Sequence, residues 1–418
     1  MIRLTFGRAR GIAKALQSPR FYGTNGGDGA QHEKVAVQMI EYALGHARSR
    51  RSGESYDEAM LVLEQGVSNL QSGGEGSVEA VGRLMLAMST LLYERGKRQD
   101  AMEKLEAAHQ LARAYLPFRV AACEGLAGLQ MEAGQVVTSL VLTDDSLEQL
   151  ASSSEGKEPD LEFLKLRAHA IKGLADLVNG DTDSAKSFFD GCQDCDVGAG
   201  THHVGNAVLS YGEFLHCTGT FSLAKDQYER VLKALDTKDT NSSSYLASVN
   251  MVPDEVLLGA TCALGQLLFH SGKFHEAEEV LTKALTKTED HFGSTHPKVG
   301  AILTCIAMMF KQKAKMEASS SILLQEGLYR RALDLLKAPA LDSEGADIHT
   351  DKSDIVALAR GGYADLLCIQ QNRKEEGERM RKWAEATWKN RRLSLAEALE
   401  FSEPSKTAVV DTRVCRIL

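Results

Sequence analysis

Apolar and polar residues follow one another along most of this chain with the period of amphipathic helices, and the predicted helices come in pairs. The clearest pair spans residues 258–285, where apolar residues recur three or four positions apart on both sides of Gly272. Gly265 lies before that glycine and Ala277 after it. Small residues allow two helix backbones to approach, and glycine readily adopts the left-handed conformation of a tight turn. The pattern therefore predicts two closely packed antiparallel helices joined at Gly272.

The same pattern recurs and predicts an all-α fold of about eight such helical hairpins over residues 32–400. The best repeats span residues 84–117, 205–235, 258–290 and 299–336, and residues 353–400 are predicted to form a degenerate last repeat and a capping helix. Small residues at matching positions define the repeats: Gly96, Ala101, Ala108, Gly212, Gly219, Ala224, Gly265, Gly272, Ala277 and Ala284. Hairpins repeated in this way stack into an elongated solenoid.

These spacings resemble the tetratricopeptide repeat (TPR), because Ala277 lies five positions after Gly272 and Ala284 lies seven positions after Ala277. The loop at residues 293–297 resembles the Gly-x-x-His-Pro loop of kinesin-light-chain repeats, and this resemblance covers residues 205–336. It implies a right-handed superhelical α-solenoid that binds peptide segments or protein surfaces in its concave face. Together with its N-terminus, the chain resembles TPR-like proteins of plant mitochondria.

The resemblance places partner binding on the first helix of each hairpin, which faces the concave side. Polar and aromatic residues at those positions are the candidate partner-binding residues: Asn206, Glu213, His216, Gln266, Phe269 and His270. An acidic concave face predicts a basic or amphipathic partner segment. Some TPR proteins bind the carboxylate tails of chaperones with a cationic clamp, whereas the matching positions here include Leu86, Leu209 and Cys262. We therefore expect protein partners, but no partner bound through a chaperone carboxylate clamp.

The first 22 residues differ in composition from the rest of the chain. They contain four arginines and one lysine, and the first acidic residue is Asp28. An arginine-rich, acid-poor amphipathic start is typical of a transit peptide. We predict a mitochondrial transit peptide at residues 1–22, a flexible linker at residues 23–31 and a location in the mitochondrial matrix. A cytoplasmic or plastid location is the alternative.

The composition narrows the possible functions. The 418 residues include 48 basic and 57 acidic side chains, for a formal net charge of −9. That balance argues against general nucleic-acid binding, because phosphate contacts need cations. The sequence has no apolar run of the roughly 18 residues that a transmembrane helix needs. It also has no phosphate-binding loop and no strong catalytic arrangement, so we expect neither an enzyme nor a bound cofactor.

One cluster has the residue types of a metal site. Cys192 and Cys195 are followed by His202, and thiolate and imidazole ligands hold tetrahedral zinc. A Cys-x-x-Cys pair is also a redox motif. Because the spacing to the histidine matches no standard site, we prefer the interpretation that these cysteines lie near a helix end and bind no metal.

Two features near the C-terminus leave alternatives open. The two tryptophans, Trp383 and Trp388, lie among basic residues, a combination that suits either a capping helix or contact with RNA or an anionic membrane surface. Residues 401–418 are predicted to be a C-terminal tail. Cys415 in that tail begins a short motif that resembles a prenylation box, so it is either prenylated or an ordinary cysteine.

Together these observations predict a non-catalytic protein–protein interaction scaffold or adaptor in mitochondria that supports assembly of an organellar complex. One alternative is a cytosolic cargo adaptor similar to kinesin light chain. The other is an accessory factor in organellar RNA processing. Repeat architecture does not separate these functions, because one fold serves many of them.

Overall fold

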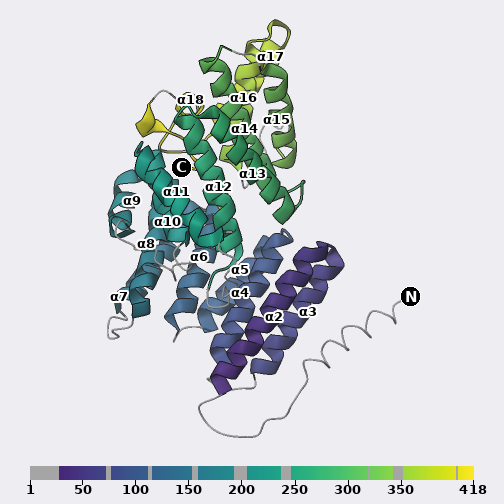
Figure 1. Cartoon of the computed structure of the whole chain (residues 1–418), viewed down its shortest axis with the longest axis vertical. Helices are drawn as coiled ribbons and strands as arrows, with labels where there is room; N and C mark the ends of the chain where they lie inside the picture. Colours follow the sequence, from purple (N-terminus) through teal and green to yellow (C-terminus); the bar gives the residue numbers. More distant parts are fainter. Residues whose placement is uncertain are drawn as a thin grey trace, which may run out of the picture. The chain divides into compact units, whose positions relative to one another are not determined.

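The computed structural model describes residues 28–71, 77–111, 115–152, 159–192, 205–236, 246–318, 321–341, 352–401 and 403–418. The chain divides into two compact units, Met1–Phe118 and Arg119–Leu418, and both consist mainly of helices (Figure 1). The predicted transit peptide at residues 1–22 lies outside the described residues. Helix α2 begins at Asp28, so the last four residues of the linker predicted at 23–31 are helical. That part of the prediction is wrong because the residues after Gly29 are mostly good helix formers.

Unit 1 contains two helical hairpins within its described residues. They are formed by α2 (Asp28–Arg50) with α3 (Gly53–Leu70), and by α4 (Val78–Glu94) with α5 (Arg98–Leu111). Helix α3 begins with a capping box, in which the side chains of Ser52 and Ser55 each accept a hydrogen bond from the backbone of the other. Small and medium apolar side chains such as Ala59 and Leu63 fill the space between the helices and are completely buried.

Unit 2 continues the same pattern with six further hairpins among its described residues. They are α6 (Leu116–Glu132) with α7 (Val136–Ser152), α8 (Pro159–Asn179) with α9 (Thr182–Phe189), α10 (Gly205–Cys217) with α11 (Phe221–Asp236), α12 (Pro253–His270) with α13 (Phe274–Phe292), α14 (Pro297–Met316) with α15 (Ile322–Leu335), and α16 (Ser353–Cys368) with α17 (Lys374–Thr387). The first residues of α6 belong to unit 1. The predicted all-α fold of about eight hairpins is therefore confirmed.

Short elements complete the chain. The short helix α18 (Leu395–Leu399) and the two-residue strands β1 (Val410–Asp411) and β2 (Arg416–Ile417) follow the last hairpin. Single 3₁₀ turns lie at η3 (Asp190–Cys192), η6 (Val249–Met251), η7 (Gln371–Arg373) and η8 (Pro404–Lys406). Of the helices described, none combines the length and the apolar character that crossing a membrane requires.

Glycine ends the first helix of five hairpins in a left-handed conformation. The glycines are Gly96, Gly134, Gly180, Gly219 and Gly272, with φ between 74° and 86°. At the last of them the amide of Gly272 donates to the carbonyl of Phe269 at 3.0 Å, and the amide of Lys273 donates to the carbonyl of Leu268 at 2.8 Å. This pair of hydrogen bonds is the Schellman motif, which satisfies carbonyls that the helix end leaves open. The turn predicted at Gly272 thus has a local physical cause.

A second glycine in three of these hairpins allows the two helices to approach. A Cβ atom placed on Gly265 would lie 2.6 Å from Cγ of Leu281 on the second helix. The same contact recurs between Gly212 and Tyr228, and between Gly173 and Phe189, at 2.9 and 2.8 Å. A large side chain on the second helix therefore occupies the space over a glycine of the first. The repeat-defining alanines are also completely buried: Ala101, Ala108, Ala224, Ala277 and Ala284.

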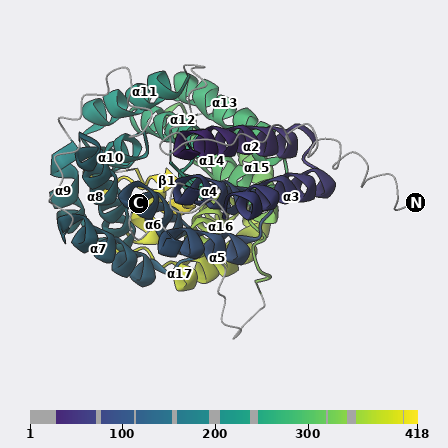
Figure 2. The same cartoon turned by 90° about the horizontal axis from the view of Figure 1, so that it is seen from below.

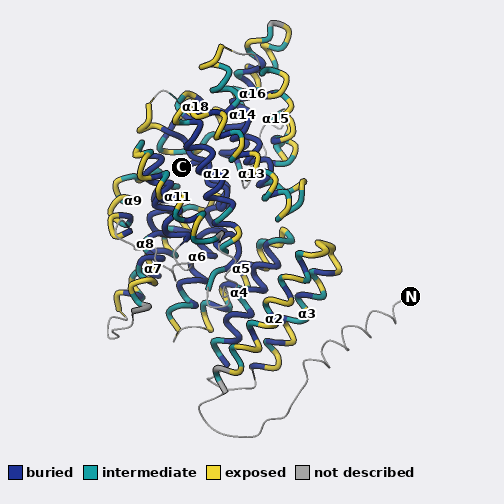
Figure 3. The backbone as a smooth tube through the Cα atoms, viewed as in Figure 1, coloured by how far each residue is buried: buried dark blue, intermediate teal, exposed yellow. Residues whose placement is uncertain are grey.

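The hairpins of unit 2 are arranged around a segment near the C-terminus of the sequence (Figure 2). The first helices of the hairpins face inward, and every residue of α10 is buried. The second helices, such as α11 and α13, carry rows of exposed residues on the outside (Figure 3). An inward-facing helix of an open solenoid would expose one side to water. The complete burial of α10 indicates that other residues cover that side.

Candidate functional site

Residues 407–418 fill the inner groove of unit 2, and we call them the inner segment. All twelve of these residues are buried. Strands β1 and β2 pair in antiparallel register, with Val410 opposite Ile417. The segment makes hydrogen bonds or ion pairs with residues of α6, α10, α12, α14 and α16, which are all first helices of hairpins. The region predicted as a C-terminal tail thus lies mostly inside the solenoid, on the face that the sequence assigns to a partner.

Arg413 makes the densest set of contacts between the inner segment and the groove. Its side chain is completely buried. The guanidinium donates hydrogen bonds to the side chains of Asn206 and Ser210 and pairs with the carboxylate of Glu213, all on α10. On the other side, Oδ2 of Asp411 lies 2.9 Å from Nη2 of Arg413. Because a guanidinium presents several donors in a rigid plane, this set of acceptors is well matched to an arginine.

Two carboxylates share this one guanidinium, so the cluster has an excess of negative charge when both are ionised. Burial raises the pKa of Glu213 well above its usual range; Arg413 opposes that shift and Asp411 adds to it. Burial alone would lower the pKa of Arg413, but Asp411 and Glu213 raise it overall, so the guanidinium stays charged. Removing the arginine would leave buried acidic groups without a counter-ion, which is strongly unfavourable.

Gln266 on α12 binds the backbone of the inner segment with both ends of its side-chain amide. Its Nε2 donates to the carbonyl oxygen of Val410 at 2.9 Å, and its Oε1 accepts from the amide of the same residue at 2.8 Å. Buried main-chain groups need such partners. Gln266 therefore acts as a neighbouring strand would, and it recognises the extended backbone rather than a particular side chain.

Further buried polar residues bind the turn between the two strands. The carbonyl oxygen of Arg413 accepts hydrogen bonds from Nζ of Lys298 at 3.1 Å and from Nδ2 of Asn250 at 3.3 Å. Lys298 also pairs with Glu255 at 2.5 Å. Burial alone would lower the pKa of Lys298, but Glu255 raises it overall, so the amine remains charged. The turn is thus held through its main chain by groups from several parts of unit 2.

The remainder of the inner segment links the two ends of unit 2. Nε of Arg416 donates to the carbonyl oxygen of Met131 on α6 at 2.7 Å, and Nη1 pairs with Asp354 on α16 at 2.9 Å. Arg392, between α17 and α18, donates to the carbonyl oxygen of Leu418 at 2.8 Å. One short segment therefore contacts both the first and the last hairpin of the unit.

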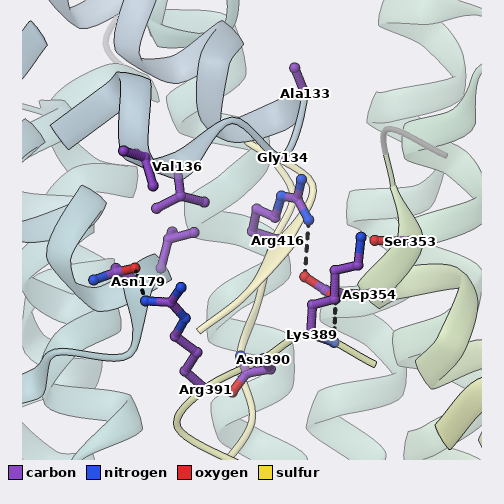
Figure 4. Close-up of a pocket in the computed structure, with 12 residues that line it drawn as sticks. Ala133, Gly134, Val136, Asn179, Ser353, Asp354, Lys389, Asn390, Arg391 and Arg416 are labelled. Carbon is purple, nitrogen blue, oxygen red and sulfur yellow. Dashed lines mark hydrogen bonds and ion pairs between the residues drawn. The ribbon is translucent and has the colours of Figure 1, made fainter. Parts of the chain in front are cut away.

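A cavity of about 420 Å³ lies beside Arg416 (Figure 4). Its lining includes Gly134 after α6, Asn179 at the end of α8, Asp354 on α16 and Arg391 before α18. The guanidinium of Arg391 donates to Oδ1 of Asn179 at 2.9 Å across it. The cavity thus lies where residues of the first, second and last hairpins of unit 2 meet beside the inner segment.

The structure places three of the six candidate partner-binding residues against the inner segment, namely Asn206, Glu213 and Gln266. The other three form an aromatic cluster nearby. Nε2 of His216 lies 2.8 Å from Nδ1 of His270, and the ring of Phe401 packs against His270 and Phe269. Burial lowers the pKa of His270 to about 3 and also lowers the pKa of His216 well below its usual range, so both rings are neutral at pH 7. Five of the six are therefore buried by residues of their own chain, and His270 is partly buried.

Sequence reasoning did not identify Asp411, Arg413 and Arg416 as functional residues. A signal was present, because seven of the twelve residues in the inner segment are apolar and several are β-branched. Such a composition is unusual for a solvated tail and favours a buried strand. Cys415, which begins the motif resembling a prenylation box, is completely buried. Burial raises the pKa of its thiol to about 12.

The possible metal cluster lies only partly within the described residues. Cys192 is buried at the end of η3, and its Sγ lies 3.9 Å from the carbonyl oxygen of Phe188. Cys195 and His202 lie outside the described residues. In the described part of the chain, no group of three or more His, Cys, Asp or Glu side chains is placed to hold a metal ion.

Trp383 on α17 and Trp388, directly after that helix, pack against the core of unit 2. The guanidinium of Arg360 lies 3.8 Å from the ring centre of Trp383, a cation–π contact. Nε1 of Trp388 donates to the carbonyl oxygen of Leu393 at 2.6 Å. These contacts engage both rings in packing, which suits the capping helix that the sequence predicts.

Comparison with known proteins agrees with the repeat spacing. Residues 257–298, which contain most of α12 and all of α13, match the family model of the tetratricopeptide repeat. No curated protein matches the chain. Among solved structures, the TPR domain of P58(IPK) is similar at 11% identity; the match covers 86% of this chain and 97% of that chain, with a TM-score of 0.20. That TM-score supports no argument about the arrangement or the partner of this chain. The identification of TPR repeats is confirmed, whereas the resemblance to kinesin light chain and to plant mitochondrial proteins stays a prediction.

Proposed function

We propose that this tetratricopeptide-repeat protein is a non-catalytic scaffold that supports assembly of a protein complex in mitochondria. The TPR fold supports a protein–protein interaction scaffold, and such repeats are generally not catalytic. The organelle and the assembly role go beyond the fold. They rest on the chemistry of the inner groove and on the composition of the first 22 residues.

One observation carries the proposal: the groove binds an extended polypeptide segment. Gln266 pairs with the main chain of Val410, and α10 presents three side chains to a single arginine. Main-chain recognition combined with one specific side-chain site is how peptide-binding surfaces hold their ligands. A scaffold of this kind recognises its protein partners through short segments and catalyses no reaction.

The mitochondrial part of the proposal rests on residues 1–22, which are arginine-rich and contain no acidic residue. This is the composition of a transit peptide. Loss of these residues would remove five positive charges, and the imported chain would be more acidic. A more acidic scaffold suits basic partner segments, in agreement with the arginine-binding wall of the groove.

Affinity purification from whole cells followed by mass spectrometry tests the proposal. The tag belongs between residues 238 and 244, which leaves both ends of the chain unaltered. We expect recovery with the subunits of one mitochondrial complex, and a mature N-terminus near Gly23. Recovery with cytosolic motor or vesicle proteins, together with an intact Met1, would replace the proposal by the cargo-adaptor alternative.

A further inference from the structure

We propose that the inner groove of unit 2 is a docking surface for an extended, arginine-bearing segment of a partner protein, and that the inner segment occupies this surface until the partner displaces it. The inference rests on the proposed scaffold function and names the chemistry of the partner. The partner segment places an arginine where Arg413 lies and presents its backbone to Gln266.

The walls of the groove are specific for such a segment. Asn206, Ser210 and Glu213 converge on one guanidinium from three successive turns of α10. Of these, only Glu213 can carry a negative charge, so the site favours a cation over a neutral side chain. Asn250 and Lys298 then bind the carbonyl of the same arginine. A partner that offers an arginine in an extended backbone satisfies both sets of contacts at once.

The inner segment leaves part of the groove unsatisfied. Two buried acceptors on groove residues that contact Arg413 find no hydrogen-bond partner within the described part of the chain: Oε1 of Glu213 and Oδ1 of Asn250. Both side chains otherwise bind Arg413. The segment also brings the carboxylate of Asp411 close to Glu213, and this raises the pKa of Glu213 beyond the effect of burial. Each of these features costs free energy. A partner segment with a neutral donor in place of Asp411 avoids the cost at Glu213.

The connection that leads to the inner segment suits release. Residues 403–406 are exposed, and η8 within them has no buried residue. Their ion pair between Lys406 and Glu397 is on the surface, where such pairs contribute little. The boundary is sharp, because burial begins at Thr407 and continues to Leu418. An exposed tether followed by a buried segment allows the segment to leave once its contacts with the groove, including the ion pair of Arg416 with Asp354 on α16, are broken.

The test uses the full chain with a protease site inserted in the exposed tether at residues 403–406. Cleavage leaves the inner segment bound but no longer covalently attached. A fluorescent synthetic peptide with the sequence of residues 403–418 is then added, and its binding is followed by anisotropy. The same peptide with Arg413→Ala is the matched probe, and protein carrying Glu213→Gln is the matched groove variant.

We expect the labelled peptide to exchange into the cleaved, folded protein. The Arg413→Ala peptide should bind at least about 30-fold more weakly, because it leaves a buried charge unpaired. That difference should shrink in the Glu213→Gln protein, which shows that the two groups interact directly. Uncleaved protein should take up far less peptide, because a short tether gives the resident segment a millimolar effective concentration.

Four results would overturn the inference. The first is loss of helical circular dichroism on cleavage, and the second is no exchange into protein that stays folded. The third is equal binding of both peptides, and the fourth is equal uptake by cleaved and uncleaved protein. The first two mean that the inner segment is a permanent part of the core. The last two mean that the groove does not select an arginine or is not occupied. None of these results bears on the organelle or on the partners recovered from cells, so the proposed scaffold function is judged separately.

Discussion

A single methyl group added at two glycines of unit 2 should change stability in opposite directions. Gly265 lies in α12 and Gly327 in α15. Replacing glycine by alanine within a helix gains about 1 kcal/mol from helix propensity. Around Gly327 no other side chain lies within 4 Å of the added Cβ. Gly327→Ala should therefore stabilise the protein by about 0.5–1 kcal/mol.

At Gly265 the same methyl group meets the second helix of the hairpin. The added Cβ would lie 2.6 Å from Cγ of Leu281, 2.7 Å from Cδ2 and 3.3 Å from the backbone nitrogen. Because the backbone of α13 is also close, a change of side-chain rotamer alone cannot relieve the contact. Overpacking costs about 1–3 kcal/mol, which exceeds the gain in propensity. We expect Gly265→Ala to destabilise the protein by up to about 2 kcal/mol.

Urea unfolding followed by circular dichroism measures both variants, and native-state hydrogen exchange in α12 and α13 locates the effect. A third variant combines Gly265→Ala with Leu281→Ala. Leu281→Ala alone leaves a cavity and costs about 2–5 kcal/mol, but in the double variant the new methyl group takes up part of that space. The two changes should therefore cost less together than their sum. If Gly265→Ala stabilises as Gly327→Ala does, or if the double variant is additive, the proposed contact between the helices is wrong.

Three further predictions concern unit 2. Burial lowers the pKa of His270 to about 3, while the unfolded value is about 6.5, so the unfolded chain binds a proton first. The free energy of unfolding should therefore fall as the pH drops from 6.5 towards 3, by at most about 1.4 kcal/mol per pH unit for this residue. In His270→Gln the urea midpoint, measured at several pH values, should depend less on pH. Trp383→Ala should lower the melting temperature and cost about 2–3 kcal/mol, less than for a fully buried tryptophan, because it removes the ring that packs under Arg360; an unchanged melt would argue against the capping role. Cys415 should resist alkylation in the native protein and react after unfolding, since its thiol is buried; rapid native labelling in a mass-spectrometric assay would contradict the position of the inner segment.

The hairpins could be predicted from sequence because their causes are local. The left-handed turn at Gly272 and the close approach at Gly265 each depend on residues fewer than twenty positions apart. Periodicity and glycine spacing record such contacts directly. The same reasoning placed Asn206 and Gln266 on the inward-facing helices.

The occupant of the groove could not be predicted in this way. Arg413 meets Glu213 across 200 positions of sequence, and no local pattern records such a pair. Strands β1 and β2 have two residues each, too few for a period-two signal. Polar residues on one face of α10 are normally read as a sign that this face contacts water. In this chain that face contacts residues 407–418 instead, so the polar pattern alone gives the wrong environment.

The inner segment also has a consequence for how unit 2 unfolds. In a simple repeat array each hairpin contacts only its neighbours, so the array can open from either end in steps. Here one segment of twelve residues bonds to α6, α10, α12, α14 and α16, and none of these helices can separate without breaking a buried polar contact. Hairpins built from local contacts form quickly, whereas contacts over some 200 residues form slowly. Unit 2 should therefore form its helices first. It should become a single cooperative folding unit only when the inner segment binds in the groove.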